Sequence, residues 1–347
     1  MCKTVLSFYC DDTNPYSAPP EAFETFLDFV SAEGIAGESS VILGYGAAEH
    51  GLLSRPTTDL QHAYIEQVQR AYARGVDAHF ELMTHGGLYD FEENRVPEGA
   101  IHEGVWMHEP AISAEEYESY FGHIIAEGER IGVRFTGLTW PGCGCEACTR
   151  RYRQLWVDGL AKRLSEGLSA GRGLRALGST LRAFRSGPEP NPNVWRALLN
   201  LARRGKFRGR SVPCFIGSER KQCAARLMAS DGTSCVYDLP PNVADRLGLW
   251  LNDPRKVDAD AYITADGKSG RIVELVRAGA PYCFLYMHWQ GVNPANGVGW
   301  DAFTRVIGRV QRLMRDQVVW MRPSEFTDWL ISRDGSRPTR VEGRLDG

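Results

Sequence analysis

The sequence has no marked excess of charge of either sign. Its 347 residues include 40 lysines and arginines against 43 aspartates and glutamates, which gives a formal net charge of -3. Proteins that bind nucleic acids or anionic membranes carry strongly basic surfaces or patches. The composition gives no sign of such a surface, so we expect neither a nucleic acid nor a membrane as a partner.

Long apolar runs are also lacking. Charged residues interrupt every apolar stretch before it reaches the roughly 20 residues of a transmembrane helix. The apolar run after Lys3 has strand length, and no cleavage site of a signal peptide follows it. The nine cysteines are an odd number and scattered, which favours reduced thiols over a disulfide framework. We therefore expect a cytoplasmic protein.

Several signature motifs of enzyme families are missing. The sequence contains no G-x-S-x-G nucleophile elbow, no phosphate-binding G-x-x-x-x-G-K and no H-E-x-x-H zinc motif. The glycines of segment 44–51 do not match a dinucleotide-binding fingerprint. These absences argue against the serine hydrolases, nucleotide-binding enzymes and zinc proteases that carry those motifs.

The sequence does show a regular alternation of two patterns. Segments with the length and apolar content of strands are 4–9, 39–45, 77–87, 134–142, 211–217, 233–240, 260–264 and 280–289. Segments with helical periodicity are 20–34, 60–75, 113–132, 270–279 and 298–316. Such alternation predicts a parallel sheet covered by helices. We expect an α/β fold, a (β/α) barrel of seven or eight strands, closed or distorted, with a doubly wound sheet as the alternative. It would form one catalytic domain over residues 1–332, followed by a disordered tail over 333–347.

Polar residues with catalytic potential follow several of the predicted strands. Asp11 and Asp12 follow the first, His85 ends the third, Trp140 ends the fourth and His288 ends the last. In parallel barrels the functional groups lie at the carboxyl ends of the strands. We therefore expect these side chains to converge on one rim of the barrel.

Two adjacent carboxylates suggest a division of roles. Their mutual repulsion separates their proton affinities, so that one can stay ionised while the other exchanges a proton. One carboxylate can bind a divalent metal and the other can accept a proton from the metal's water. A histidine on another strand, such as His288, can protonate a leaving group. The plainer interpretation, in which Asp11 caps a turn and Asp12 is solvated, remains open at this point.

Five segments together resemble the motifs of the polysaccharide deacetylases. They are "LSFYCDD" (6–12), "FELMTHGG" (80–87), "GVRFTGLTWPG" (132–142), "YCFLYMHWQG" (282–291) and "VVWMRPSEFTDWL" (318–330). Each motif is short, and the resemblance rests on their order and spacing over nearly the whole chain.

This resemblance implies a metal-dependent hydrolase that removes acyl groups from a carbohydrate. The second aspartate of the pair, Asp12, and the histidine of the second motif, His85, would bind a divalent metal, with zinc as the expected ion. The first aspartate, Asp11, would be the base, and His288 of the last motif would be the catalytic acid.

The sequence departs from the family pattern at the third metal ligand. The family places a second histidine four residues after the first, and here that position is Tyr89. We expect either that Asp90, His79 or His108 replaces it or that the metal is absent. A buried structural histidine is an alternative interpretation of His79.

Three closely spaced cysteines follow the fourth predicted strand. Cys143, Cys145 and Cys148 form a C-x-C-x-x-C cluster. A structural zinc site needs four ligands, so a fourth would have to come from elsewhere, for example Cys10. The cluster therefore predicts either a zinc site or three reduced thiols packed in a loop.

Four aromatic residues lie beside the predicted rim, namely Tyr16, Tyr89, Trp140 and Trp289. Aromatic rings offer flat apolar area on which sugar rings can stack. We expect these residues to bind substrate, with packing in the core as the alternative.

Two other functions fit the same residues. A glycoside hydrolase needs two carboxylates flanking the cleaved bond, and Asp11 or Asp12 with Glu81 or Asp90 would supply them. A catalytically inactive sugar-binding barrel would explain the missing second histidine. The sequence carries no signal for the oligomeric state.

Overall fold

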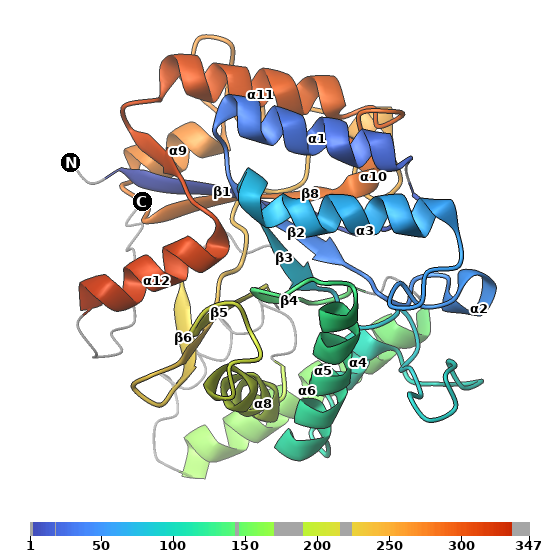
Figure 1. The fold of residues 1–347 in the computed structure, drawn as a ribbon. Coiled ribbons are helices and arrows are strands. Elements are labelled where there is room, and N and C mark those ends of the chain that lie inside the picture. Colours follow the sequence, from blue (N-terminus) through green and yellow to red (C-terminus); the bar gives the residue numbers. More distant parts are fainter. Residues whose placement is uncertain (1–2, 18, 143–145, 170–189, 216–223, 335–347) are drawn as a thin grey trace.

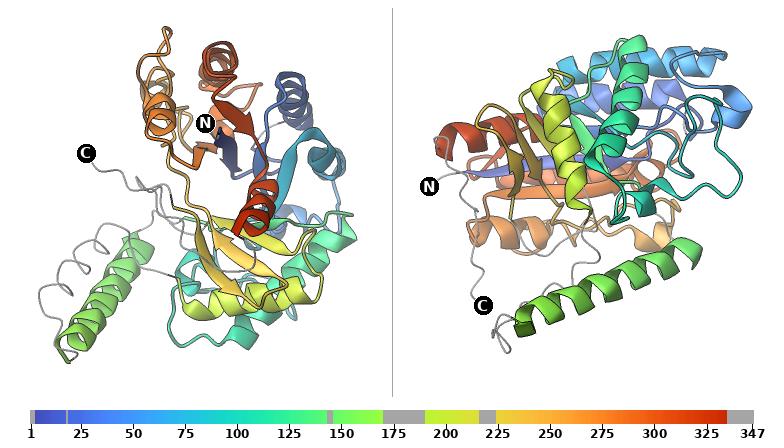
Figure 2. Two further views of the ribbon diagram at one scale, coloured as in Figure 1. Left: turned by 90° about the vertical axis from the view of Figure 1, so that its left-hand side faces the viewer. Right: turned by 90° about the horizontal axis from the view of Figure 1, so that it is seen from below.

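The computed structural model describes residues 3–17, 19–142, 146–169, 190–215 and 224–334. A mostly parallel sheet curls into a distorted barrel, and helices cover its outer side (Figures 1 and 2). The strands are β1 Thr4–Asp11, β2 Gly37–Val41, β3 Val76–Phe80, β4 Gly137–Thr139, β5 Ser211–Phe215, β6 Arg226–Ser230, β7 Cys235–Asp238, β8 Tyr282–His288 and β9 Val318–Trp320.

The α-helices vary from one turn to 24 residues in length. They are α1 Pro20–Glu33, α2 Ala47–His50, α3 Asp59–Ala71, α4 Glu103–Trp106, α5 Ala114–Arg130, α6 Glu146–Ser169, α8 Pro192–Arg203, α9 Arg271–Arg277, α10 Trp289–Val292, α11 Trp300–Leu313 and α12 Pro323–Asp334. Two 3-10 turns, η1 Tyr72–Arg74 and η2 Pro254–Lys256, complete the described elements.

The order of strands in the sheet is β6-β7-β5-β4-β3-β2-β1-β8, and β9 also pairs with β1. Among these pairings only β6 with β7 is antiparallel. An isolated parallel bridge between Val243 and Leu285 joins the segment after β7 to β8. The barrel is therefore closed at this seam by a loop rather than by a full strand pair.

Strand β1 is the centre of the fold. All eight of its residues are buried, as is typical of a parallel strand that is covered on both faces. Phe8 packs outward against Phe26 of α1 and Phe303 of α11, whereas Tyr9 packs inside the barrel against Phe215 and Phe284. The alternation of side chains along a strand thus fills two separate cores.

The structure confirms the predicted barrel and most of its elements. Helix α5 begins with a capping box, in which the Ser113 hydroxyl accepts from the Glu116 amide and the Glu116 carboxylate accepts from the Ser113 amide. The barrel is distorted in that β6 runs antiparallel and the seam lacks a full pair. Helices α6 and α8 and strand β6 are additions to the predicted pattern.

Several predicted strands are shorter than expected or absent. Segments 39–45, 77–87 and 134–142 contain strands that end at Val41, Phe80 and Thr139. Segment 260–264 was expected as a strand and forms a turn instead. Its apolar residues Tyr262 and Ile263 are fully buried in the core, so burial of an irregular segment produced the strand-like pattern.

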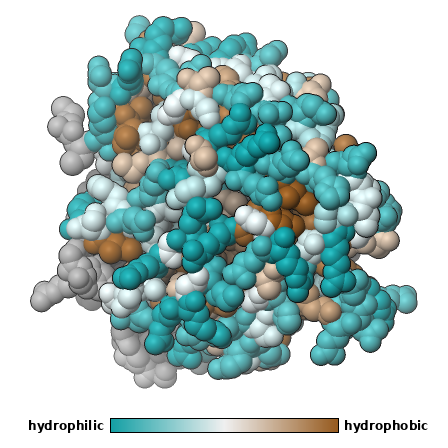
Figure 3. Space-filling view, in the orientation of Figure 1, coloured by the Kyte–Doolittle hydropathy of each residue, from teal (hydrophilic) through white to brown (hydrophobic). Residues whose placement is uncertain are grey.

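The end of the chain, the lengths of the helices and the surface are described next. Of the tail predicted from residue 333, positions 333 and 334 belong to α12, and 335–347 lie outside the described residues. No helix in the described part of the chain is long and apolar enough to cross a bilayer. The face shown in Figure 3 is mostly hydrophilic, with small, separate hydrophobic areas.

Candidate metal and acid-base site

Two neighbouring strands carry predicted site residues that are far apart in the sequence. Strands β1 and β8 are paired in parallel, with Asp11 directly beside His288. Asp12 is the next residue after β1. The barrel therefore brings the aspartate pair and His288 to the same rim, as expected from strand ends in a parallel barrel.

A third element adds a compact group of possible metal ligands. Asp12, Glu81 and His85 each offer one ligand atom, and these atoms lie within 4.8 Å of one another. The His85 Nε2 atom is 3.2 Å from Asp12 Oδ1 and 3.2 Å from Glu81 Oε1. The Glu81 side chain is almost fully buried, and those of Asp12 and His85 are 13% and 27% exposed. The group is thus open to solvent on the His85 side.

The local backbone explains how Glu81 and His85 meet. Strand β3 ends at Phe80, and the chain then turns with positive φ angles at Leu82 and His85. Asp12 also has a positive φ, of 67°. Such angles are uncommon for residues other than glycine, and they gather at functional sites where the surroundings hold them. Two of the three possible ligands therefore sit on strained backbone.

Hydrogen bonds fix the Glu81 carboxylate between β1 and β2. Its Oε2 atom accepts from the Asp12 backbone amide at 3.1 Å and from the Ser40 hydroxyl. The Oε1 atom remains directed at His85. One oxygen of Glu81 thus anchors the turn after β1, and the other is available to a ligand.

The charges of this group are strongly coupled. Burial disfavours the charged form of His85, but Glu81 and Asp12 outweigh it and raise the pKa of His85 to about 12. Burial also opposes ionisation of Asp12, yet the hydrogen bond and charge of His85 lower the pKa of Asp12 below its ordinary value. The side chain of Gln290 adds a hydrogen bond to Asp12.

His288 forms a second group with three partners. Its Nδ1 atom is 2.7 Å from Asp245 Oδ2, and its Nε2 atom is 3.2 Å from the Tyr286 hydroxyl. Tyr286 is also hydrogen-bonded to Asp11. Burial lowers the pKa of His288, but the Asp245 hydrogen bond and the charge of Asp11 raise it to about 9. His288 is therefore protonated at neutral pH.

Asp11 lies between the two groups. It is 3% exposed, and burial raises its pKa well above the ordinary value of an aspartate, with Glu81 adding to the effect and His288 opposing it. Its Oδ1 atom has no hydrogen-bond partner in the described part of the chain. Asp11 is thus a buried carboxylate with one unengaged oxygen beside a protonated histidine.

The donor set of Asp12, Glu81 and His85 fits a divalent cation. Catalytic zinc sites use three protein ligands, often histidines with a carboxylate, and leave a position for water or substrate. Two carboxylates with one imidazole also suit Mn²⁺. Because the three donor atoms face one another and the His85 side is open, these residues are suited to hold such an ion.

The three residues predicted as a third ligand lie elsewhere. Asp90 sits in a turn, where its carboxylate accepts from the amides of Glu92 and Glu93. His79 is fully buried inside the barrel beside Glu38, and burial lowers its pKa to about 3. His108 is buried against Trp140 and Tyr152. Glu81 lies beside His85 instead, because the turn after β3 brings its carboxylate to within reach of the His85 ring.

The predicted aromatic residues separate into different environments. Trp289 is 1% exposed and packs against Phe23 and Phe26 in the core, so the prediction that it contacts substrate is wrong. Tyr16 stacks on His50 with ring centroids 4.1 Å apart. Trp140 is partly exposed and donates to the Gly104 carbonyl.

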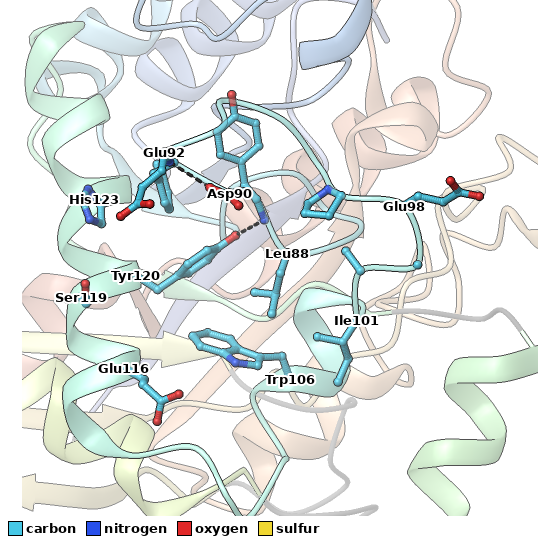
Figure 4. Close-up of a pocket in the computed structure, with 15 residues that line it drawn as sticks. Leu88, Asp90, Glu92, Glu98, Ile101, Trp106, Glu116, Ser119, Tyr120 and His123 are labelled. Atoms are coloured by element: carbon cyan, nitrogen blue, oxygen red, sulfur yellow. Dashed lines mark hydrogen bonds between the residues drawn. The ribbon is translucent and has the colours of Figure 1, made fainter.

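Tyr89 belongs to a cavity next to the candidate site. The cavity has a volume of about 560 Å³ and lies between segment 88–101, Trp106 and α5 (Figure 4). Its walls include Tyr89, Phe91, Trp106 and Tyr120. None of the acidic or histidine residues of the two groups at the rim lines it.

The cysteine cluster is described in part. Cys148 is buried at the start of α6 and packs with Val105 and Leu155. Cys143 and Cys145 lie outside the described residues, so the choice between a zinc site and packed thiols stays a prediction. Cys10, named as a fourth ligand, is buried in the core under α1.

Sequence reasoning missed three members of the site. Glu81 was considered only as a glycosidase carboxylate, although its spacing of four from His85 in "ELMTH" was visible. Asp245 follows β7 in an irregular segment, and Tyr286 lies inside the apolar β8. No local pattern marks Asp245, because only the closed barrel brings it next to His288. Tyr286 lies two residues before His288 on β8, a spacing that places both side chains on the same face of the strand.

Comparisons with known proteins give similarity at the level of structure only. No protein-family model matches the sequence, and a search of curated proteins gives no significant match. The structure is similar over nearly its whole length to solved polysaccharide deacetylases at low sequence identity.

Three solved structures illustrate this similarity. One is a "T48 deacetylase with substrate" (10% identity, TM-score 0.43), aligned over 99% of this chain and 96% of that chain. Another is a Mycobacterium smegmatis protein assigned as a polysaccharide deacetylase (14% identity, TM-score 0.47), with the same two shares. A third is a mutant of BA3943, a pseudoenzyme of the CE4 family (7% identity, TM-score 0.37), aligned over 93% of this chain and 67% of that chain. These values concern the course of the backbone alone.

Proposed function

We propose that this chain is a metal-dependent hydrolase that removes acyl groups from a carbohydrate. The observation that carries the proposal is the pairing of two groups at one rim. Asp12, Glu81 and His85 form a set of cation ligands, and His288 with Asp245 forms a protonated histidine beside Asp11. The carbohydrate substrate is inferred from the resemblance of the sequence motifs to the polysaccharide deacetylases.

Each residue then has a distinct role. Asp12, Glu81 and His85 would hold the ion, which supplies a Lewis acid and a water of lowered pKa when bound. Asp11 would accept a proton from the attacking water, and Tyr286 would orient the Asp11 carboxylate. His288, held by Asp245 through Nδ1, would deliver a proton from Nε2 to the departing group.

The first test is the metal content of the purified wild type and of Asp12→Ala. We expect one equivalent of divalent metal, zinc or manganese, at the site in the wild type and its loss in the variant, because Asp12 supplies one of three ligands. Metal that persists in Asp12→Ala would assign it to the cysteines. A wild type that takes up no metal would contradict the proposal and favour a sugar-binding barrel without this chemistry.

The second test separates metal binding from proton transfer. Asp11→Asn keeps the shape of the side chain and removes its basicity, so we expect normal metal content and a loss of turnover of about 100- to 10,000-fold. The measurement is acetate release from N-acetylated and O-acetylated sugar oligomers. Turnover at the wild-type rate in Asp11→Asn would show that another group is the base. Cleavage of an aryl glycoside without metal would instead favour a glycoside hydrolase.

A further inference from the structure

The loop that carries His85 lies beyond the end of β3, and the Glu81 amide at its start donates to the Val41 carbonyl of β2. This segment, residues 81–87, is called the His85 loop below. It follows the end of β3 at Phe80 and contains positive φ angles at Leu82 and His85. Such angles persist only where the surrounding structure determines them, and buried amides need hydrogen-bond acceptors. A specific group must therefore hold this loop.

That group is the carboxylate of Glu103, at the first residue of α4. Glu103 is fully buried, and its Oε1 atom accepts from the Met83 amide at 2.9 Å. Its Oε2 atom accepts from the amides of Thr84 and His85, both at 3.0 Å. One side chain thus receives three consecutive backbone N–H groups, the last of which belongs to His85.

Further bonds fasten Glu103 itself. The Tyr120 hydroxyl of α5 donates to Glu103 Oε1 at 2.6 Å and accepts from the Tyr89 amide at 3.0 Å, the latter drawn as a dashed line in Figure 4. The Glu103 amide donates to the Gly86 carbonyl at 2.7 Å. Glu103 therefore connects the His85 loop with α5 through Tyr120, which lines the cavity of Figure 4.

We propose that Glu103 is a positioning residue that fixes the His85 loop so that the His85 imidazole faces Asp12 and Glu81. The expected effect on metal binding rests on the proposed function. The positioning of the His85 loop by Glu103 does not depend on a metal. Glu103 touches neither Asp12 nor Glu81 in the hydrogen bonds of the described residues, and it acts through the backbone of His85.

The chemistry of a carboxylate explains why glutamate is suited to this position. An ionised carboxylate is an acceptor only, and its two oxygens can serve several donors. The amide of glutamine keeps one acceptor and turns an NH₂ group toward the converging N–H donors. In Glu103→Gln the loop therefore loses at least one acceptor, although the volume of the side chain is unchanged.

The experiment compares Glu103→Gln, Tyr120→Phe and Glu127→Gln with the wild type. Glu127 is the matched control, because it is another buried glutamate, on α5, whose partners Ser54 and Arg130 are outside the His85 loop. Two quantities are measured. One is amide hydrogen exchange of Met83, Thr84 and His85 in metal-free protein, and the other is the Kd for Zn²⁺.

We expect Glu103→Gln to speed exchange at these three amides beyond the change in amides of the core strands, and to raise the Kd for Zn²⁺ about 10- to 100-fold, as is typical for residues that orient a metal ligand. Tyr120→Phe, which keeps the carboxylate, should give a smaller rise of about 2- to 10-fold. Glu127→Gln should leave both local quantities at the wild-type level after correction for global stability.

Unchanged exchange at Met83–His85 in Glu103→Gln would overturn the inference, as would equal effects in Glu127→Gln. If Glu103→Gln does not fold, Tyr120→Phe decides, because an unchanged exchange and Kd in that variant would also overturn it. Failure of the proposed function would give a different result from failure of this inference. The wild type and Asp12→Ala would then bind Zn²⁺ equally or not at all, and amide exchange alone would decide whether Glu103 positions the loop.

Discussion

At the scale of single residues, the side chains around His288 favour its protonated form. The Asp245 carboxylate is hydrogen-bonded to its Nδ1 atom, and the Tyr286 hydroxyl to its Nε2 atom. The negative charges of Asp11 and Asp12 add to the effect of Asp245. These partners favour the imidazolium, so the proton is a stabilising part of the folded state. The consequence can be measured without a substrate.

The stability of the protein should therefore depend on pH through His288. Its pKa is about 9 in the fold, against an ordinary value of about 6.5. A raised pKa means that the contribution is fully present below pH 6.5 and is lost as the pH rises through 9. In metal-free protein we expect the difference in unfolding free energy between the wild type and His288→Asn to shrink by about 3 kcal/mol over that range.

Urea unfolding at pH 6, 8 and 10 checks this expectation. His62→Asn, on the exposed side of α3, is the control and should follow the wild type at each pH. A difference between the wild type and His288→Asn that is constant from pH 6 to pH 10 would contradict the assigned interaction with Asp245 and Asp11.

At the scale of elements, α5 illustrates what local sequence determines. Its capping box was visible as Ser113-x-x-Glu116, and both reciprocal hydrogen bonds are present. The helix supports Tyr120 and one wall of the cavity beside the His85 loop. The stability of this helix end therefore bears on the surroundings of the candidate site.

Removal of the cap should weaken the fold by a modest amount. We expect Ser113→Ala to lower the free energy of unfolding by about 1 kcal/mol, because the Glu116 amide loses its acceptor. Ser119→Ala, at an exposed position within the same helix, should cost little. Equal effects of the two substitutions in chemical denaturation would show that the capping bonds contribute nothing.

Other elements could not be read from local patterns. The predicted strand 77–87 was too long, because the backbone turns after Phe80 with positive φ angles at Leu82 and His85, and the His85 amide donates to Glu103, which is distant in the sequence. This difference bears on the expected third ligand. In a strand continuing to His85, residues 79 and 81 would both share its face, and the observed turn brings Glu81 to within ligand distance of His85. Tertiary hydrogen bonds here override the apolar pattern.

At the scale of the whole molecule, the alternation of strands and helices predicted the barrel and its rim. Asp11, Asp12, His85 and His288 were assigned to that rim from strand order alone, and the fold brings them together. Asp245 could not be found in this way, because it lies beyond β7 in the irregular segment that closes the seam near Val243. The position of Asp245 beside His288 depends on closure of the barrel, which no local sequence pattern predicts.

The position of β1 between late strands has a consequence for synthesis of the protein. Strand β1 is made before β8 and β9, yet it pairs with both of them. While the ribosome is still adding those residues, one edge of β1 has no partner, and unpaired edges invite association between chains. Sheets that depend on such distant pairings form slowly. The aspartate pair and its histidine neighbour therefore meet only after β8 has been made.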